Sequence, residues 1–300
     1  MTNTQQKAYE AIQRKEQYVA VELLQNENQN DAVTLSMLGH AYFGLGDFES
    51  AYDVFQKLYY DPNLVSDEFD LTQPEKADPL GNMVFQAMEQ SQTLDLLSRV
   101  PKNPDMNYPQ SNEDAEEHFP EFLEYQAFID RMRRAGGGNP ERIHQLLIAE
   151  LKKMLETGDP AQEARVNYYK AESNLATGRY VEAALEYLEA ASLESKALYY
   201  GFAGNMFFKF VMQNEQWEYL VPASVLTHRA IRIDPKCAKW YFYEAMILLA
   251  ITKLLSPQEI FLSSAEFYAQ KALSVLRPDQ RQLRNTIEQW MEELRRNGVF

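Results

Sequence analysis

The sequence predicts an all-α protein built from antiparallel helix pairs, and two observations favour this fold class. Hydrophobic residues make up 45% of the 300 residues, which is enough for a sizeable core, and they recur at helical spacing without sustained strand-like alternation. The 12 glycines and 13 prolines amount to about 8% of the chain, against roughly 12% in average usage. A turn-rich β-sandwich would need more of both.

The first 60 residues fit two helix pairs. Residues 5–26 are expected to form a helix pair or one broken helix. Two further helices are expected within 32–60, separated by a glycine-containing break at 44–47, and the aspartate, proline and asparagine at 61–63 should end the second.

The stretch from 61 to 125 has a different composition. It holds seven of the 13 prolines, and 15 acidic residues against three basic ones. Short helices are expected near 79–90 and 92–100, followed by a loop, and helix returns at about 113–134, where Pro120 should kink or restart it. Most of the net charge of −15 therefore belongs to this stretch, and the remaining chain is close to neutral.

From residue 136 onward one helix follows another. Three glycines at 136–138 end the preceding helix. Asn139, Pro140 and Glu141 then start a helix to about 156, with a capping side chain, a proline at the first helical position and an acid in the first turn. The helices expected after it cover 161–177, 180–193, 196–213, 217–233, 236–254, 259–276 and 279–297.

Residues 32–65 resemble a tetratricopeptide repeat, a unit of two antiparallel helices in about 34 residues. Counted from Ala32 as position one, the matching residues are Leu38 and Gly39 at positions seven and eight, Tyr42 at eleven, Ala51 at twenty and Phe55 at twenty-four. Weaker matches cover about 164–195 and begin again near Ala223, with Trp240 at the fourth position of a further repeat. The resemblance implies that such pairs stack into a right-handed α-solenoid, because one pair cannot bury its apolar face alone.

On this basis the chain divides into three parts. Residues 1–65 hold the N-terminal helices and the first repeat-like unit, 66–160 form a divergent acidic insertion of helices and loops, and 161–300 hold the further repeat-like units. A capping helix is expected at 279–297. Its apolar face carries Leu283, Ile287, Trp290, Met291 and Leu294.

Charge and cysteine content disfavour several classes of function. A net charge of −15 argues against a nucleic-acid binder, which needs a basic face, and against docking on anionic lipid. No window is long and apolar enough for a transmembrane helix, and the N-terminus has no signal-peptide pattern. With the single cysteine Cys237 no internal disulfide can form, so a cytoplasmic protein without membrane insertion is expected.

No catalytic, metal or cofactor motif emerges from the sequence. His118 and Glu121 stand at helical spacing, but Pro120 interrupts them and no second cluster completes a metal site. The glycines at 136–138 lack the strand and the Lys-Ser/Thr of a nucleotide-binding loop. Cys237 lies between two lysines that would activate an exposed thiol, but an ordinary inter-helix cysteine is the favoured interpretation. We therefore expect no enzyme activity and no cofactor.

The features that remain point to a partner protein. In the family that the chain resembles, certain positions of each repeat face a concave groove, and aromatic side chains at such positions suit peptide or helix recognition. The predicted groove residues are Ser36, His40, Phe43, Arg165, Tyr168, Glu172 and Tyr241. A second candidate surface is an acidic patch of Glu113, Asp114, Glu116, Glu117, Glu121 and Glu124, which would attract a basic partner.

The sequence thus predicts a non-enzymatic adaptor or scaffold whose partner is a peptide or helix of basic or amphipathic character. Two alternatives stay open. One is an assembly or secretion chaperone that keeps a client protein soluble, and the other is a regulatory enzyme with a catalytic piece in 66–160. The sequence also leaves open the oligomeric state and the choice between the groove and the acidic patch.

Overall fold

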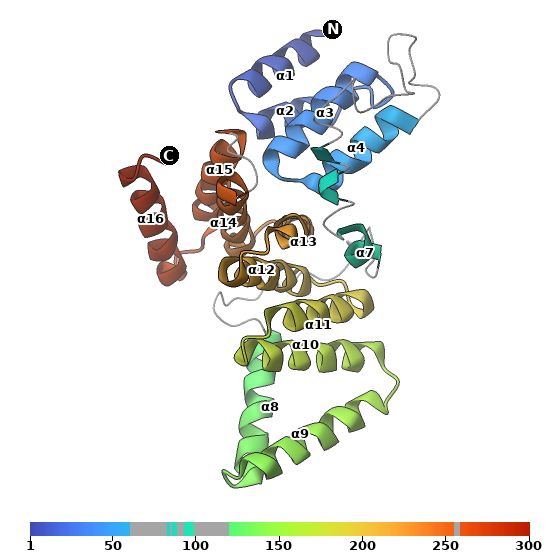
Figure 1. Cartoon of the computed structure of the whole chain (residues 1–300), viewed down its shortest axis with the longest axis vertical. Coiled ribbons are helices and arrows are strands. Elements are labelled where there is room, and N and C mark those ends of the chain that lie inside the picture. The colour runs from blue at the N-terminus through green and yellow to red at the C-terminus, as the bar shows by residue number, and fades with distance from the viewer. Residues whose placement is uncertain (61–82, 85, 89–92, 99–119, 255–258) are drawn as a thin grey trace.

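The computed structural model describes residues 1–60, 83–84, 86–88, 93–98, 120–254 and 259–300 (Figure 1). All regular structure in these ranges is helical, which confirms the all-α fold class. Of the helices expected near 79–90 and 92–100, the structure describes a few helical residues and α7 (Thr93–Ser98). The expected loop that follows, and the first residues of the helix expected from 113, lie outside the described ranges.

The N-terminal region forms two helix pairs. Its helices are α1 (Asn3–Gln13), α2 (Gln17–Leu24), α3 (Ala32–Leu45) and α4 (Phe48–Tyr60). Residues 5–26 therefore form a pair and not one broken helix, because the chain turns at Lys15, which has a positive φ of 61°. The break at 44–47 ends α3 at Gly46, whose φ of 80° lies in the left-handed region that glycine adopts without strain.

The helices after residue 119 lie close to their predicted positions. They are α8 (Pro120–Gly136), α9 (Pro140–Leu155), α10 (Pro160–Ala176), α11 (Tyr180–Leu193), α12 (Ala197–Asn214), the short 3₁₀ helix η1 (Trp217–Tyr219), α13 (Leu220–Ile233), α14 (Ala238–Leu254), α15 (Glu259–Val275) and α16 (Arg281–Arg296). Pro120 is the first residue of α8, where its missing N–H breaks no helical hydrogen bond. The predicted cap of α9 is confirmed, since the Asn139 side chain accepts a hydrogen bond from the Arg142 N–H.

Asp31 links the two N-terminal helix pairs through its side chain. The Oδ2 atom caps α3 by accepting a hydrogen bond of 2.8 Å from the Thr34 N–H, and it also accepts one of 2.6 Å from the Gln5 side chain of α1. Replacing Asp31 by alanine is expected to lower the free energy of unfolding by about 1–2 kcal/mol, because the cap and this link are both lost. Asp31→Asn is the control. Chemical denaturation should show little change for it, since asparagine is an equally good cap.

Adjacent helices pack in pairs through small residues, as the repeat-like pattern predicts. A Cβ atom on Gly39 of α3 would lie 2.5 Å from the ring of Phe55 in α4, so the absence of a side chain allows the close approach. Gly204 plays the same part between α12 and α13, since a Cβ there would lie 2.7 Å from the Ala223 carbonyl oxygen. Each helix from α8 to α16 packs on the next one along the chain, which is compatible with a helical repeat.

The N-terminal helices α1–α4 do not continue the stack at the end that α8 and α9 form. They lie beside α13, α14 and α15, while α8 and α9 form the opposite end of the molecule (Figure 1). The Phe43 ring of α3 lies 5.2 Å from the Phe261 ring of α15, and Tyr18 of α2 stacks at 5.0 Å on Phe267. Helices separated by about 200 residues of sequence thus share one core.

The last helix has the amphipathic character predicted for a cap. Ile287, Met291 and Leu294 of α16 are buried, and Leu283 and Trp290 are half-buried against the core. The Trp290 ring meets the Phe242 ring of α14 edge-on at 5.6 Å. The opposite face carries exposed charged side chains.

Candidate functional site

A small cleft lies where α8, α10 and the start of α12 converge. Its volume is about 90 Å³. α8 contributes two acidic residues, and α10 contributes an alanine, an arginine and two tyrosines. The link before α12 contributes an acid and a lysine, and α12 itself contributes a tyrosine. The lining residues are Glu121, Glu124, Ala161, Arg165, Tyr168, Tyr169, Glu194, Lys196 and Tyr199.

Charged side chains of both signs line the cleft. The Lys196 Nζ donates to Glu121 Oε1 at 2.9 Å and lies 3.0 Å from Glu194 Oε2. Burial opposes the charge of Lys196, but its bonds to the two carboxylates outweigh this effect and raise the pKa of the lysine. At the more exposed rim, Arg165 and Glu124 pair at 3.2 Å. The cleft thus already holds an ammonium group between two carboxylates.

Tyrosine rings form the floor of the cleft. Tyr168, Tyr169 and Tyr199 are all buried, and the Tyr168 and Tyr199 rings lie 6.0 Å apart. Burial, together with the charge of Glu172, raises the pKa of Tyr168 far above its ordinary value. Its hydroxyl meets no described group with good hydrogen-bond geometry, although Glu172 is close enough to influence it.

Beneath this floor lies a buried carboxyl group. Glu172 accepts a hydrogen bond of 2.7 Å from the Tyr187 hydroxyl. Burial raises the pKa of Glu172 above its ordinary value, and the hydrogen bond from Tyr187 opposes this shift in part. Glu172 therefore supports the tyrosine floor from within the core and does not face the cleft.

The predicted groove residues do not form one continuous surface. Arg165 and Tyr168 line the cleft, whereas Ser36 and His40 lie half-exposed on α3 in the N-terminal part. Phe43 is buried between Phe48 and Phe261, and Tyr241 is buried against Tyr268 at 6.3 Å. These two aromatic side chains pack against α15, which the position count within a single repeat cannot anticipate.

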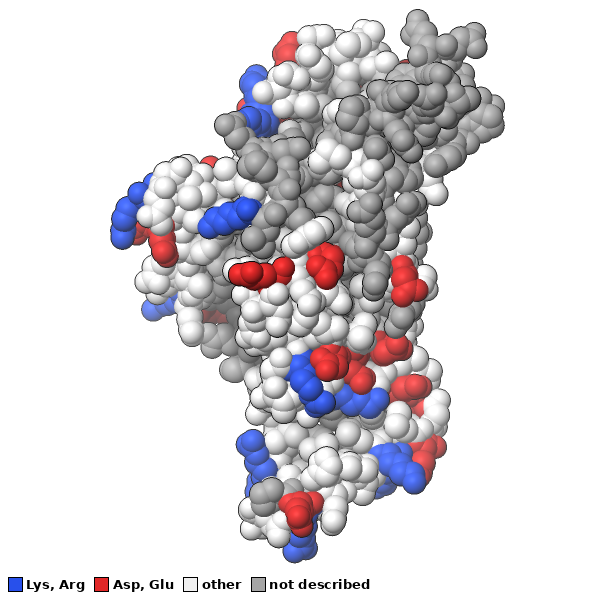
Figure 2. All heavy atoms as spheres, in the orientation of Figure 1, with Lys and Arg blue, Asp and Glu red and all other residues white. Residues whose placement is uncertain are grey.

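The predicted acidic patch is described only in part. Glu113, Asp114, Glu116 and Glu117 lie outside the described residues, whereas Glu121 and Glu124 line the cleft. Two residues of the predicted groove and two of the predicted patch therefore line one cleft. Around it, basic and acidic side chains are interspersed over the part of the surface formed by α8 to α11 (Figure 2).

Sequence reasoning missed several residues of the cleft. Glu194, Lys196 and Tyr199 lie in the link between α11 and α12 and at the start of α12, where no groove position is expected. The tyrosine pairs at 168–169 and 199–200 were the available signal, because adjacent aromatic residues are more than one face of an amphipathic helix needs. No sequence pattern identifies Lys196 as a residue of the cleft.

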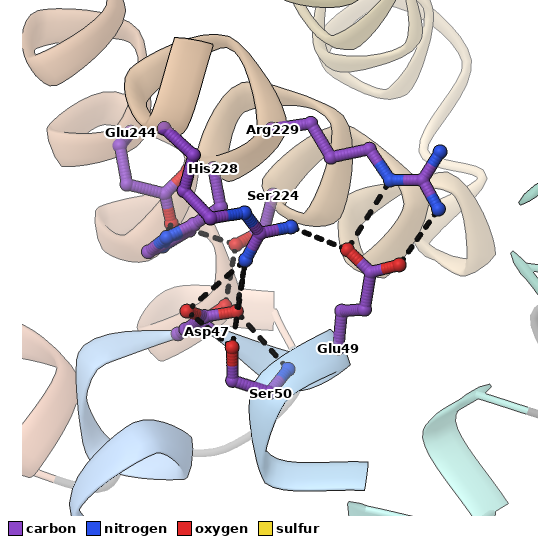
Figure 3. A network of polar contacts seen from close by, with 9 residues as sticks. Asp47, Glu49, Ser50, Ser224, His228, Arg229 and Glu244 are labelled. Carbon is purple, nitrogen blue, oxygen red and sulfur yellow. Dashed lines mark hydrogen bonds and ion pairs between the residues drawn. The ribbon is translucent and has the colours of Figure 1, made fainter. Parts of the chain in front are cut away.

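A second polar cluster lies at the junction between the N-terminal and C-terminal helices (Figure 3). The Arg229 guanidinium of α13 donates to both carboxylate oxygens of Glu49 in α4, at 2.7 and 3.2 Å, and both side chains are buried. Arg232 pairs with Asp47 at 3.3 Å and also contacts Glu49. This cluster, which we call the junction network, joins residues about 180 positions apart.

The junction network also holds a serine, a histidine and a carboxyl group. Ser224 Oγ contacts the Gly46 carbonyl oxygen at 2.9 Å and Glu244 Oε1 at 2.6 Å, while His228 Nε2 lies 3.3 Å from Glu244 Oε1. Burial raises the pKa of Glu244 well above its ordinary value and lowers that of His228, so the neutral forms are favoured. Because Ser224 and Glu244 are fully buried, a substrate cannot reach them in this conformation.

Cys237 lies in the link between α13 and α14. The residue is partly exposed, but its partial burial, together with the charge of Asp234, raises the pKa of the thiol to about 12. We expect no reaction with Ellman's reagent at pH 8 in the folded protein, where the thiolate fraction is about one in ten thousand. After unfolding in guanidinium one thiol per chain should react. Rapid reaction of the folded protein would contradict this prediction.

Two kinds of feature are absent from the described residues. No group of three or more histidine, cysteine, aspartate or glutamate side chains there could hold a metal ion. Within the same residues, no helix is both long and apolar enough to cross a bilayer.

No known protein-family model matches the sequence, and no curated protein matches it either.

Proposed function

We propose that the protein is a non-enzymatic interaction module, an adaptor that holds a segment of a partner protein in the cleft between α8, α10 and α12. The observation that carries this proposal is the composition of the cleft. Aromatic rings supply contact area at low entropic cost, and a charged rim supplies orientation and specificity. Both occur together around a preformed hollow.

The helix pairs support the same proposal. Residues 32–65 resemble a tetratricopeptide repeat. In such a repeat the two helices are expected to pack closely at the small residue, and Gly39 packs closely on Phe55. Stacked helix pairs present extended surfaces that suit protein partners. A stack of this kind also positions the cleft rigidly, since α8, α10 and α12 each pack on neighbouring helices.

Ala161 offers a direct test, because it lines the cleft, is exposed and carries no charge. The probe is a phage-displayed library of random 12-residue peptides selected on the purified protein. Peptides that occupy the cleft should lose at least tenfold in affinity, measured by fluorescence polarisation, when Ala161→Phe fills it. Ala149→Phe, at an exposed position of α9 away from the cleft, is the control and should leave binding unchanged.

Two outcomes of this selection count against the proposal. If no peptide is enriched over an empty support, the cleft does not hold peptides. If enriched peptides bind Ala161→Phe as well as they bind the unmodified protein, they occupy another surface. Thermal unfolding of both variants should match that of the unmodified protein, so that lost binding is not lost folding.

A further inference from the structure

We infer that the cleft recognises a cationic side chain, a lysine or an arginine of the partner segment, and that Lys196 occupies this place when no partner is bound. The inference rests on the proposed function and names the chemistry that the same cleft selects. Three features carry it, namely the balance of charge, the aromatic floor and the position of Lys196.

The balance of charge in the cleft is negative. Among the described residues of the lining, Glu121, Glu124 and Glu194 stand against Arg165 and Lys196. Each of the two cations is already paired, Lys196 with two carboxylates and Arg165 with one. An anionic ligand would have to break these pairs and face three carboxylates, whereas a cationic ligand meets an excess of negative charge.

The floor of the cleft suits a cation for a second, independent reason. The Lys196 Nζ lies 5.8 Å from the centroid of the Tyr199 ring, within the range in which an ammonium is attracted to an aromatic face. The Tyr168 ring, 6.0 Å from the Tyr199 ring, adds a second aromatic side chain to this floor. Carboxylates around aromatic faces are a combination that binds ammonium and guanidinium groups.

Lys196 is placed so that it can leave. It precedes the first residue of α12 and its side chain caps nothing. About 29% of that side chain is exposed, and a lysine has four rotatable bonds over which to swing outward. The carboxylates it would vacate belong to α8 and to the link before α12, and they stay in place. Glu121 Oε2 accepts no hydrogen bond from a described residue, so it is available to an incoming donor.

The test uses peptides selected for cleft-dependent binding, with each lysine replaced by norleucine or each arginine by citrulline, one at a time. One such replacement is expected to weaken binding to the unmodified protein at least tenfold. The same replacement should change binding to the double variant Glu121→Gln, Glu194→Gln by less than threefold, because the carboxylates that read the charge are gone. Glu182→Gln together with Glu189→Gln, both exposed on α11, is the matched control and should keep the tenfold effect.

A further variant tests the role of Lys196. Lys196→Met vacates the carboxylates and should tighten the basic peptide at least threefold, with a steeper dependence of affinity on salt. Two results would overturn the inference and leave the proposed function intact. One is that cleft-dependent peptides contain no lysine or arginine. The other is that replacing lysine by norleucine or arginine by citrulline weakens binding to the double variant as much as binding to the unmodified protein. The absence of any peptide sensitive to Ala161→Phe would instead overturn the proposed function.

Discussion

Arg229→Met is expected to lower the free energy of unfolding by about 3–5 kcal/mol, because it leaves the Glu49 carboxylate buried without its main partner. Both side chains are almost fully buried, and two hydrogen bonds of 2.7 and 3.2 Å join them. Arg232 also contacts Glu49, but its side chain is 39% exposed and it is shared with Asp47. Arg232 therefore replaces only a part of the hydrogen bonding and positive charge that Arg229 provides to Glu49.

Urea denaturation followed by circular dichroism measures this effect. Arg295→Met is the control, because Arg295 forms one exposed ion pair of 3.0 Å with Glu266, and such pairs contribute at most about 1 kcal/mol. The double variant Glu49→Leu, Arg229→Met should recover most of the loss, since no buried charge is left unpaired. A loss for Arg229→Met no larger than that for Arg295→Met would show that the junction network does not stabilise the fold.

Gly39→Ala is expected to cost about 1–3 kcal/mol, because the new methyl group would overlap the Phe55 ring. The Cβ atom would lie 2.5, 2.7 and 2.8 Å from three ring carbons. These distances are shorter than a van der Waals contact between carbon atoms. The ring belongs to a fully buried side chain, so it cannot rotate into solvent. The helices α3 and α4 must then move apart, which also loosens the core on either side.

The same pair permits a compensation experiment. Phe55→Leu alone leaves a gap, whereas in the Gly39→Ala background the smaller leucine gives the methyl group room. The double variant should therefore be more stable than the sum of the two single losses predicts, by about 0.5–3 kcal/mol. Additive losses would mean that Gly39 and Phe55 are not in direct contact. Differential scanning calorimetry of all four proteins distinguishes the two results.

The helices themselves could be predicted closely because their signals are local. Caps such as Asn139, prolines at first helical positions and an apolar face repeated every third or fourth residue all lie within one helix. The packing of Gly39 on Phe55 was predictable for the same reason, since the two residues belong to one helix pair. Pro120 illustrates the limit of this reasoning, because a proline that kinks a helix and one that starts it have the same sequence signal.

The candidate site could be predicted only in part because its residues come from elements that are separate in sequence. Arg165 and Tyr168 were identified from repeat positions and Glu121 and Glu124 from charge, but their meeting depends on how α8 packs against α10. Phe43 and Tyr241 show the reverse case. Their repeat positions predicted that they face an open groove, yet α15 covers both. No local sequence pattern shows which helix covers a given face.

The docking of α1–α4 beside α13–α15 also has a consequence for biosynthesis. Phe43 can contact Phe261 only after α15 has been synthesised. Glu49 can pair with Arg229 only after the ribosome has added a further 180 residues. At roughly 5–20 residues per second, this interval is about 9–36 s. During this time the apolar surface of α3 and the carboxylate of Glu49 face solvent or a chaperone. Contacts of such high sequence separation also slow folding, so the core of the N-terminal helices is completed only after α13 and α15 have been made.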